Sequence, residues 1–525
     1  NHTRRFYFRL QLTPGGITDP NSRLSSSRAM AKDLSVSRNT VLFAYDQLIS
    51  EGYCVAHEGS GTFVSSEVFS SETLKGGTPL KRAAGAVLPK TASAKTVAAK
   101  PVSARTAAEV PTMPPQTSAI AAQKSSLAFV RSMLSATAQA LGDGRTNLTT
   151  AYEVGPKIDF KYGEPAFSDL PIETWARLVG RRARNLTERQ LSYQTAHGTQ
   201  ELRSALCRYL ARARGVSCSP EQIVIVQGTQ QGIDLVNRLL IDERDSVVVE
   251  EPQYRGLVAS LEMMKADIQF VPVDEEGMQV DHLSDIQHAK MINVTPSHQF
   301  PAGGVLSLKR RLKLLDWAKT KNAFVLEDDY DGEFRYEGRP IPSLQSLDKD
   351  GRVIYMGTTS KILFPALRIG WLVMPEPLVA PMRMLKSIAD RGSSTLEQLA
   401  LCDLITEGHL DRHIHRIRKR HARRRKVLIN AIEKHMGNRV TVIGSQAGIH
   451  LLLRIDSLKA KYSQAVVASA RERGVGVYST EPYYNKAPAK IELILGYAAV
   501  SEGLIEEGIK RLKQAVDQTE TDASI

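Results

Sequence analysis

The stretch GTTSKILFPALRIGW at residues 357–371 places a lysine among hydroxyl side chains, just before an apolar run. A lysine amine forms a Schiff base only when it can lose its proton, which burial or a nearby positive charge promotes. Thr358 and Ser360 offer hydroxyl donors, and Arg368 offers a forked cation that suits phosphate. Taken alone, Lys361 is more simply interpreted as an exposed surface lysine, so partners are needed from elsewhere in the chain.

A cluster of carboxylates in VLEDDYDGEF (325–334) follows another apolar run. Side chains alternate faces along a strand, so Asp328 and Tyr330 point one way while Glu327 and Asp329 point the other. A carboxylate beside a phenol can hold a protonated heterocyclic nitrogen and a neighbouring hydroxyl oxygen. A solvated acidic loop is the alternative for this stretch alone.

A third feature is IVIVQGTQQGIDLV (223–236), in which an apolar run ends at Gly228, Thr229 and Gln230 and a helical pattern begins. Free backbone N–H groups at a helix start attract anions such as phosphate, and glycine allows a close approach of the backbone. Many strand-to-helix turns share this pattern, so an ordinary turn remains the alternative.

The spacing of apolar runs predicts the elements that position these groups. Seven runs alternate with helical segments from about residue 156, which favours an α/β fold with a seven-stranded, mostly parallel sheet covered on both faces. The runs are 223–226, 246–250, 268–273, 291–295, 323–327, 353–356 and 369–374. After residue 400 a long basic helix, strands at 449–455 and 491–497 and a last helix predict a smaller α+β subdomain.

The order of these motifs resembles the fold type I family of pyridoxal-phosphate enzymes, the aminotransferase fold, over residues 156–516. The resemblance implies that Lys361 forms the Schiff base, Asp328 pairs with the pyridine nitrogen and Tyr330 with the phenolic oxygen. Tyr254 would stack on the ring, and Tyr193 would reach the phosphate across a dimer interface. The other phosphate ligands would be Gly228, Thr229, Gln230, Thr358, Ser360 and Arg368.

Two positions depart from that family. Phe300 in HQFPAGG stands where many aminotransferases have an asparagine, and His298 or Gln299 is expected to take over the contact with the ring oxygen. Ile494 in IELILGYA stands where the family has the arginine that grips a substrate's α-carboxylate. The loss of a bidentate, charge-assisted contact disfavours ordinary α-amino acids as ligands.

The amino-terminal segment 23–64 predicts a different kind of unit. Ser26 or Ser27 can cap a helix that runs to Leu34, a second helix follows Ser37, and GYCVAHEGSGTFV reads as a hairpin. The segment resembles the winged helix-turn-helix DNA-binding domain of the GntR family of bacterial regulators, over residues 1–68. The resemblance implies DNA contacts by Arg28, Arg38, Asn39 and Thr40, and a wing that approaches the backbone at Gly59 and Gly61. A helical hairpin with a solvated polar face is the alternative.

Composition agrees with an acidic partner. The net charge is +13 and the sequence pI about 9.4, and residues 69–155 are rich in Ala, Ser, Thr, Pro and Lys, which predicts a flexible basic linker. The four cysteines show no CxxC or metal-ligand spacing, so we expect no metal site. We expect them to be reduced thiols of a cytosolic protein. No apolar run predicts a membrane span. The opening NHTRRFYFRL has no methionine, and we therefore expect the chain to be incomplete at that end. The basic helix at 409–428 is either a solvated face or a secondary DNA contact.

A winged helix, a linker and an aminotransferase-like domain together resemble the MocR subgroup of GntR regulators. The resemblance implies a cytoplasmic, nucleoid-associated transcription regulator that binds double-stranded promoter DNA as a head-to-tail homodimer. Its effector would be a small amine, or pyridoxal 5'-phosphate itself, and whether it also turns over a substrate is open. The rival interpretation is a working aminotransferase with an appended DNA-binding module, and a third is a DNA-binding module with a cofactor-free domain.

Overall fold

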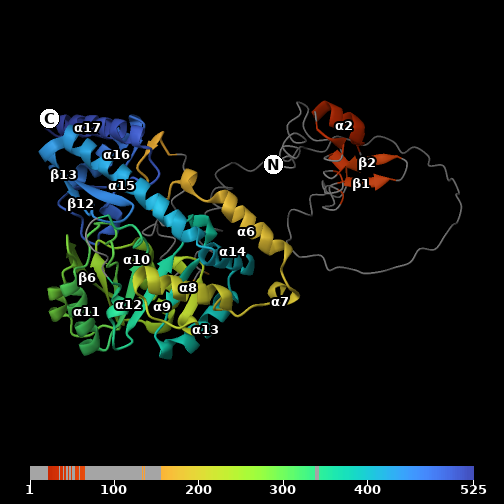
Figure 1. The fold of residues 1–525 in the computed structure, drawn as a ribbon. Helices are drawn as coiled ribbons and strands as arrows, with labels where there is room; N and C mark the ends of the chain where they lie inside the picture. Colours follow the sequence, from red (N-terminus) through yellow and green to blue (C-terminus); the bar gives the residue numbers. More distant parts are fainter. Residues whose placement is uncertain are drawn as a thin grey trace, which may run out of the picture. The chain divides into compact units, whose positions relative to one another are not determined.

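The computed structural model describes residues 22–34, 36–38, 41–42, 45, 49, 54–57, 60–64, 133, 135, 155–336 and 342–524. Contacts divide the chain into two units, residues 1–112 and 113–525, and each is described by itself (Figure 1). The predicted linker at 69–155 lies almost wholly outside the described residues, as do the predicted DNA contacts Asn39 and Thr40 and the predicted wing residue Gly59.

The first unit contains a short helix and a hairpin. Helix α2 spans Ser27–Leu34, and the Ser26 hydroxyl accepts a hydrogen bond from the backbone N–H of Ala29 at 3.2 Å, which confirms the predicted helix and its cap. Strands β1 (Cys54–His57) and β2 (Gly61–Val64) pair antiparallel, as the hairpin prediction required. The helix and hairpin share a small core of Leu24, Val41, Tyr45, Cys54 and Val64.

The second unit is built on an eight-stranded sheet whose order is β4-β11-β10-β9-β8-β5-β6-β7. Strand β11 runs antiparallel to both of its neighbours, β4 and β10, and β7 runs antiparallel to β6 at the other edge. The other six strands of the sheet, β4 included, are parallel to one another. The seven predicted runs are all strands of this sheet. The sheet has one strand more than predicted, β7, which is only two residues long. The strands are β4 (Ile223–Val226), β5 (Ser246–Glu251), β6 (Asp267–Asp274), β7 (Gly277–Met278), β8 (Met291–Val294), β9 (Phe324–Asp329), β10 (Val353–Thr358) and β11 (Gly370–Val373).

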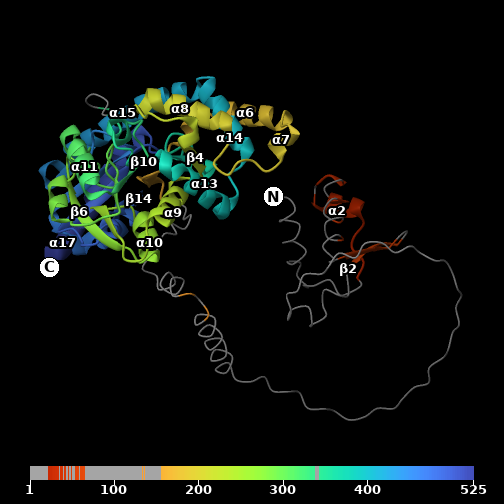
Figure 2. The ribbon, with the colours of Figure 1, turned by 90° about the horizontal axis from the view of Figure 1, so that it is seen from below.

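Helices cover both faces of this sheet, which explains why its strands are almost wholly apolar. One face packs against α9 (Thr229–Leu240), α10 (Arg255–Met263) and α13 (Glu376–Asp390) (Figure 2). The other packs against α6 (Ile172–Arg184), α8 (Gln200–Arg214), α11 (Leu308–Lys321), α12 (Leu344–Leu347) and α14 (Thr395–Thr406). A single helical turn, α7 (Glu188–Leu191), follows α6.

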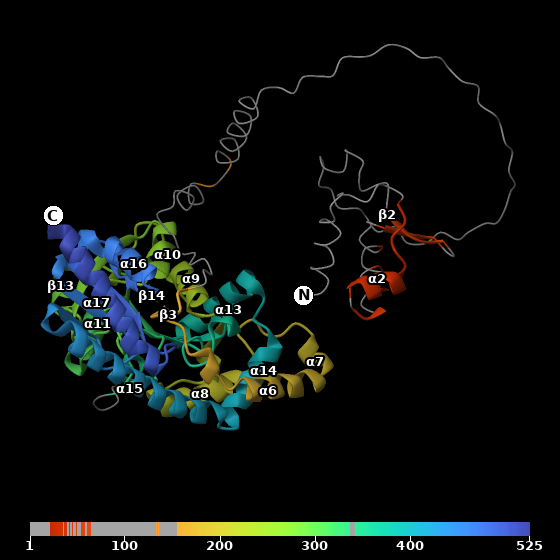
Figure 3. The same cartoon turned by 90° about the horizontal axis from the view of Figure 1, so that it is seen from above.

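The predicted smaller α+β subdomain follows, with a core of its own. Its sheet has the order β12-β13-β16-β15, and α17 packs along α15 (Figure 3). A short parallel pair joins β14 (Val475–Gly476) to β3 (Ile158–Asp159). The other elements are α15 (His409–Met436), α16 (Ser463–Glu472), α17 (Glu502–Ser524), β12 (Val440–Ile443), β13 (His450–Lys459), β15 (Tyr478–Ser479) and β16 (Lys490–Gly496). None of the helices in the described part of the chain combines the length and apolar character needed to cross a membrane.

Candidate cofactor site

Lys361 lies three residues past the end of β10, in the turn that leads to the antiparallel strand β11. Its side chain is partly buried, and Nζ donates a hydrogen bond to the carbonyl oxygen of Gly163 at 2.7 Å. Burial lowers the pKa of the Lys361 amine, and the nearby carboxylates of Asp331, Asp328 and Glu164 act in the opposite direction. The amine is therefore closer to losing its proton than an exposed lysine, as nucleophilic chemistry requires.

Asp328 is the carboxyl group on β9 that faces Lys361. The predicted alternation is confirmed by its neighbour, since Asp329 points to the opposite face and accepts hydrogen bonds from Arg214 at 2.6 Å and Tyr355 at 2.7 Å. Burial, reinforced by the charge of Asp329, raises the pKa of Asp328 to about 7. Its Oδ1 atom is buried and has no hydrogen-bond partner among the described residues, so the site leaves one acceptor open for a donor that the chain does not supply.

Tyr330, two residues further on, is tied to His298. The Nδ1 atom of His298 lies 3.0 Å from the Tyr330 hydroxyl and 3.0 Å from Oδ2 of Asp331, and both His298 and Asp331 are buried. Of the two predicted replacements for the missing asparagine, His298 adjoins this phenol. Gln299 instead donates to the carbonyl oxygens of Pro252 and Phe300, each at 2.8 Å.

Sequence reasoning missed three contributors to this part of the site. Asp331 was visible in the run EDDYDGEF, but only the structure shows its bond to His298. His450, whose ring centroid is 4.7 Å from that of His298, comes from the smaller subdomain, and Gly163 comes from a loop nearly two hundred residues before Lys361. Donor atoms of His298, Asp331 and His450 lie within 4.8 Å of one another, a spacing that could also hold a metal ion.

Gly228, at the amino end of α9, lies directly against Arg368. Its φ is +80°, and a Cβ atom built there would lie only 2.9 Å from Nη2 of Arg368. The Arg368 guanidinium donates to the carbonyl oxygen of Gln227 at 2.6 Å, and Thr358 donates to Ser360 at 2.9 Å. Thr229 and Gln230 form the first turn of α9, whose free N–H groups add to this arrangement. The structure thus brings together the groups that were predicted to surround a phosphate.

Aromatic rings line the side of the site near Phe300. The Phe300 ring lies 6.2 Å from Tyr254, 5.9 Å from Tyr162 and 5.1 Å from Tyr483, measured between centroids. Tyr254, the predicted stacking residue, caps α10 and is partly buried. The rings offer flat apolar surfaces to a planar ligand.

Ile494 lies at the far end of these rings. Along β16 the odd-numbered neighbours Leu493 and Leu495 belong to the core of the smaller subdomain, so Ile494 faces the other side of the sheet. It pairs there with Tyr478, whose ring centroid is 5.4 Å from that of Tyr162. An apolar side chain therefore occupies the position at which the resemblance places a carboxylate-binding arginine.

Tyr193 is the predicted site residue that the single chain does not bring to the others. It is 89% exposed and lies in the loop after α7. In the first unit, Arg28 is exposed on α2, Arg38 donates to the Ser27 hydroxyl at 3.3 Å, and Gly61 begins β2 with a φ of +108°. A conformation of that kind favours glycine.

The residues present fit a planar, phosphorylated cofactor with a basic ring nitrogen. The unpartnered Asp328 oxygen would accept from the ring nitrogen, the amine of Lys361 lies near that carboxylate, and a side chain at Gly228 would push Arg368 away. The fold and this site together define a fold type I domain of the aminotransferase class, for which the cofactor is pyridoxal 5'-phosphate.

Comparison with known proteins agrees with this definition. Residues 155–512 match the family model of aminotransferase class I and II. The chain is 34% identical over 500 residues to the probable rhizopine catabolism regulatory protein MocR of Rhizobium meliloti, covering 95% of this chain and 90% of that protein. It is 31% identical over 513 residues to the uncharacterized HTH-type transcriptional regulator YdeL of Bacillus subtilis, covering 97% and 95%.

Among solved structures, the α-aminoadipate aminotransferase LysN of Thermus thermophilus, complexed with N-(5'-phosphopyridoxyl)-L-leucine, superposes with a TM-score of 0.66. The two sequences are 27% identical, and the match covers 72% of this chain and 97% of LysN. The chain belongs to the aminotransferase class I and II family and, through its full-length relatives, to the MocR-type regulators of the GntR family.

Proposed function

We propose that this protein is a transcription regulator that binds double-stranded promoter DNA and uses pyridoxal 5'-phosphate to sense an amine or the cofactor's own supply. The observation that carries the proposal is that one chain joins a capped helix and a glycine-bearing hairpin to a site built around Lys361 and Asp328. Relatives named as regulators match both parts, whereas relatives named as aminotransferases match about 70% of the chain.

The chain's own groups suit this role. When bound, the cofactor supplies an electrophilic carbon to which a primary amine can attach. Lys361 would hold that carbon, Asp328 would pair with the ring nitrogen, and His298 with Tyr330 would border the ring oxygen. The phosphate would be held by Gly228, Thr229, Gln230, Thr358, Ser360 and Arg368. Because Lys361 and Asp328 belong to the subdomain of the main sheet and His450 to the smaller subdomain, an amine bound at this site would change charge and contacts where the two subdomains meet, and would so bias a two-state assembly.

The effector is an amine without an α-carboxylate, or the cofactor itself. Ile494 and the rings of Tyr162 and Tyr478 offer no charged partner for a carboxylate, and burial of an unpaired carboxylate is costly. Titration of the holo-protein with amines and with α-amino acids, followed by the visible absorption of the bound cofactor, tests this. Amines should change the absorption at lower concentration, and tight exchange with ordinary α-amino acids would contradict the proposal.

The regulator acts as a head-to-tail homodimer in which Tyr193 of one chain completes the phosphate site of the other. The exposure of Tyr193 in a single chain supports this, because an aromatic ring that is 89% exposed leaves a large apolar surface for a partner subunit to cover. Light scattering of the purified protein, with a dimer expected, tests the assembly.

Footprinting of the protein on its own upstream DNA, with and without pyridoxal phosphate, tests the function as a whole. A footprint that changes with cofactor supports a regulator. The variant Lys361→Ala should lose covalently held cofactor and this response, while Lys319→Ala, whose exposed amine on α11 pairs with Asp350 at 3.0 Å, should keep both. A DNA response that persists unchanged in Lys361→Ala would favour a DNA-binding module with an idle domain.

A working aminotransferase with an appended DNA-binding module is the second candidate. Its support is the 29% identity over 374 residues to aromatic-amino-acid aminotransferase 1 of Thermococcus litoralis. Sustained, multi-turnover transamination together with no detectable DNA binding would favour it over the regulator.

A further inference from the structure

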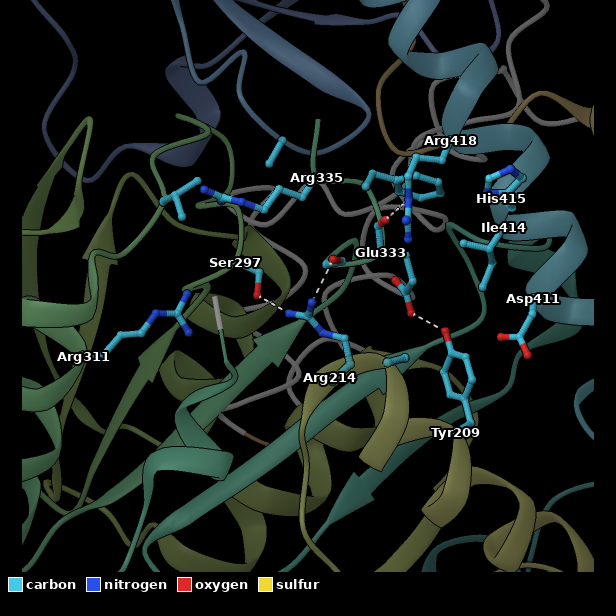
Figure 4. A pocket seen from close by; sticks show the side chains of 15 residues that line it. Tyr209, Arg214, Ser297, Arg311, Glu333, Arg335, Asp411, Ile414, His415 and Arg418 are labelled. Atoms are coloured by element: carbon cyan, nitrogen blue, oxygen red, sulfur yellow. Dashed lines mark hydrogen bonds between the residues drawn. The ribbon is translucent and has the colours of Figure 1, made fainter. Parts of the chain in front are cut away.

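A cavity of about 420 Å³ lies between the main sheet and helix α15 (Figure 4). Its walls come from the end of α8, from α11, from the segment that follows β9 and from the first half of α15, with Arg214, Arg311, Glu333, Arg335 and Arg418 among the lining residues. Cavities of this size commonly hold small-molecule ligands.

The cavity is separate from the cofactor site. Lys361, Asp328, Tyr330 and Arg368 do not line it. Alternation along β9 sends Asp328 to the cofactor side and Asp329 to the other, where Asp329 binds Arg214, a residue of the cavity wall, at 2.6 Å. The cavity and the cofactor site therefore lie on opposite sides of β9.

Positive charge dominates the cavity wall. Arg311 is 1% exposed and donates only to backbone carbonyl oxygens, those of Leu306 at 2.8 Å, Pro342 at 2.9 Å and Pro296 at 2.6 Å. Arg418 donates to the carbonyl oxygen of Glu333 at 2.8 Å. Within the described residues, neither guanidinium forms an ion pair with a carboxylate, although the charges of Glu327 and Asp329 act on Arg311 from further away.

The two acids in the wall do not balance these arginines. Asp411 is engaged by Arg212, which does not line the cavity, at 2.6 Å. Glu333 accepts a hydrogen bond from the Tyr209 hydroxyl at 2.9 Å, and burial raises its pKa to about 7, so it is often neutral at that pH. Figure 4 shows Arg214, Arg311, Arg335 and Arg418 reaching the cavity from different elements.

We propose that this cavity binds a small oxyanion, a phosphate or a carboxylate, as a second ligand site distinct from the cofactor site. Guanidinium groups bind such oxyanions through paired, charge-assisted hydrogen bonds. The exposed Arg418 and the neighbouring His415 lie on successive turns of α15, where a ligand can enter from solvent. A ligand there contacts the first half of α15 and also Arg214, the ion-pair partner of Asp329, so it acts on the strand that carries Asp328.

Calorimetric titration of the holo-protein with inorganic phosphate and, separately, with succinate tests the proposal. The holo-protein is used because its cofactor phosphate already fills the subsite at Gly228 and Arg368. Saturable binding of phosphate alone identifies a phosphate ligand, and binding of succinate alone identifies a carboxylate ligand. Either result, or binding of both probes, supports an oxyanion site. If neither probe binds saturably, the proposal is overturned.

Variants assign the binding to this cavity. Arg418→Gln should weaken binding at least about tenfold, since one charge-assisted contact is lost. Arg423→Gln is the matched control, because Arg423 is exposed on the same helix and does not line the cavity. Both variants should retain the visible absorption of bound cofactor, which reports folding. Binding that is unaffected by Arg418→Gln, or equally weakened by Arg423→Gln, would overturn the assignment.

Discussion

Two adjacent carboxylates on β9, Asp328 and Asp329, have different roles because their surroundings differ. Asp329 is satisfied by Arg214 and Tyr355, whereas Asp328 is buried and one of its oxygens has no partner in the part of the chain that the structure describes. The alternation of strand side chains made this division predictable from the sequence. The bonds of His298 to Tyr330 and Asp331 were not predictable, because they depend on how a turn after β8 packs against the end of β9.

Asp328→Asn should stabilise the cofactor-free protein above neutral pH. The folded-state pKa of Asp328, about 7, exceeds the ordinary value of 3.8, so ionisation is disfavoured in the folded protein and stability falls as pH rises between these values. Each pKa unit corresponds to about 1.4 kcal/mol. The melting temperature of the variant should exceed that of the wild type at pH 8, and the difference should shrink at pH 5.

The same substitution should weaken cofactor binding, since an amide is a poorer acceptor for a charged ring nitrogen. Asp242→Asn, at an exposed position, is the control and should change neither property. A cofactor-free Asp328→Asn protein that melts below the wild type at pH 8 would contradict the assigned burial of this charge.

Elements were easier to predict than contacts. Runs such as those that became β4 and β5 are continuous and rich in β-branched residues, because helices bury both faces of the sheet. Strand β7 escaped prediction because two residues, Gly277 and Met278, carry no periodicity. The turn between β4 and α9 was recognised from its glycine, but its approach to Arg368 joins segments 140 residues apart and follows only from the order of strands in the sheet.

Gly228→Ala should weaken cofactor binding by about tenfold or more. Alanine at a φ of +80° is strained, by about 1 kcal/mol or more, and its Cβ would displace the Arg368 guanidinium. Gly351→Ala is the matched control, since Gly351 also has a positive φ, of +65°, but no atom of the described residues lies within 4 Å of its Cβ position.

Thermal unfolding and the dissociation constant for pyridoxal phosphate, measured on both variants, separate the two effects. Both should lose stability, and only Gly228→Ala should lose cofactor affinity. Equal affinities in the two variants would mean that the contact between Gly228 and Arg368 has no role in holding the phosphate.

At the scale of the whole molecule, the sequence predicted a two-part chain whose basic charge suits DNA. Arg38→Ala should weaken promoter binding by about tenfold and reduce its salt dependence, because a lost phosphate contact releases fewer counterions. Arg189→Ala, an exposed arginine in the second unit, is the control. Electrophoretic mobility shifts at two salt concentrations give the comparison, and equal losses in both variants would mean that Arg38 makes no specific contribution.

We expect each cofactor site to contain Lys361 of one chain and Tyr193 of the other chain of the dimer. If so, each phosphate site needs Lys361 of its own chain and Tyr193 of the partner subunit. Tyr193→Ala should then lower cofactor affinity without removing the covalent link, and Tyr193→Phe should show whether the hydroxyl carries the effect. Exposure of the Tyr193 ring, which is 89% in the single chain, leaves it uncovered for such a contact with the partner subunit.

Subunit mixing makes the test decisive. In a heterodimer of Lys361→Ala and Tyr193→Ala chains, both defects fall in the site of the Lys361→Ala chain, and the other site is wholly intact. Refolding the two variants together should therefore restore about a quarter of the tight cofactor sites that a wild-type sample contains, since half of random dimers are heterodimers and each has one intact site of two. If the mixture has no more tight cofactor sites than the separately refolded variants, Tyr193 lies outside the shared site. That result would also contradict the head-to-tail dimer.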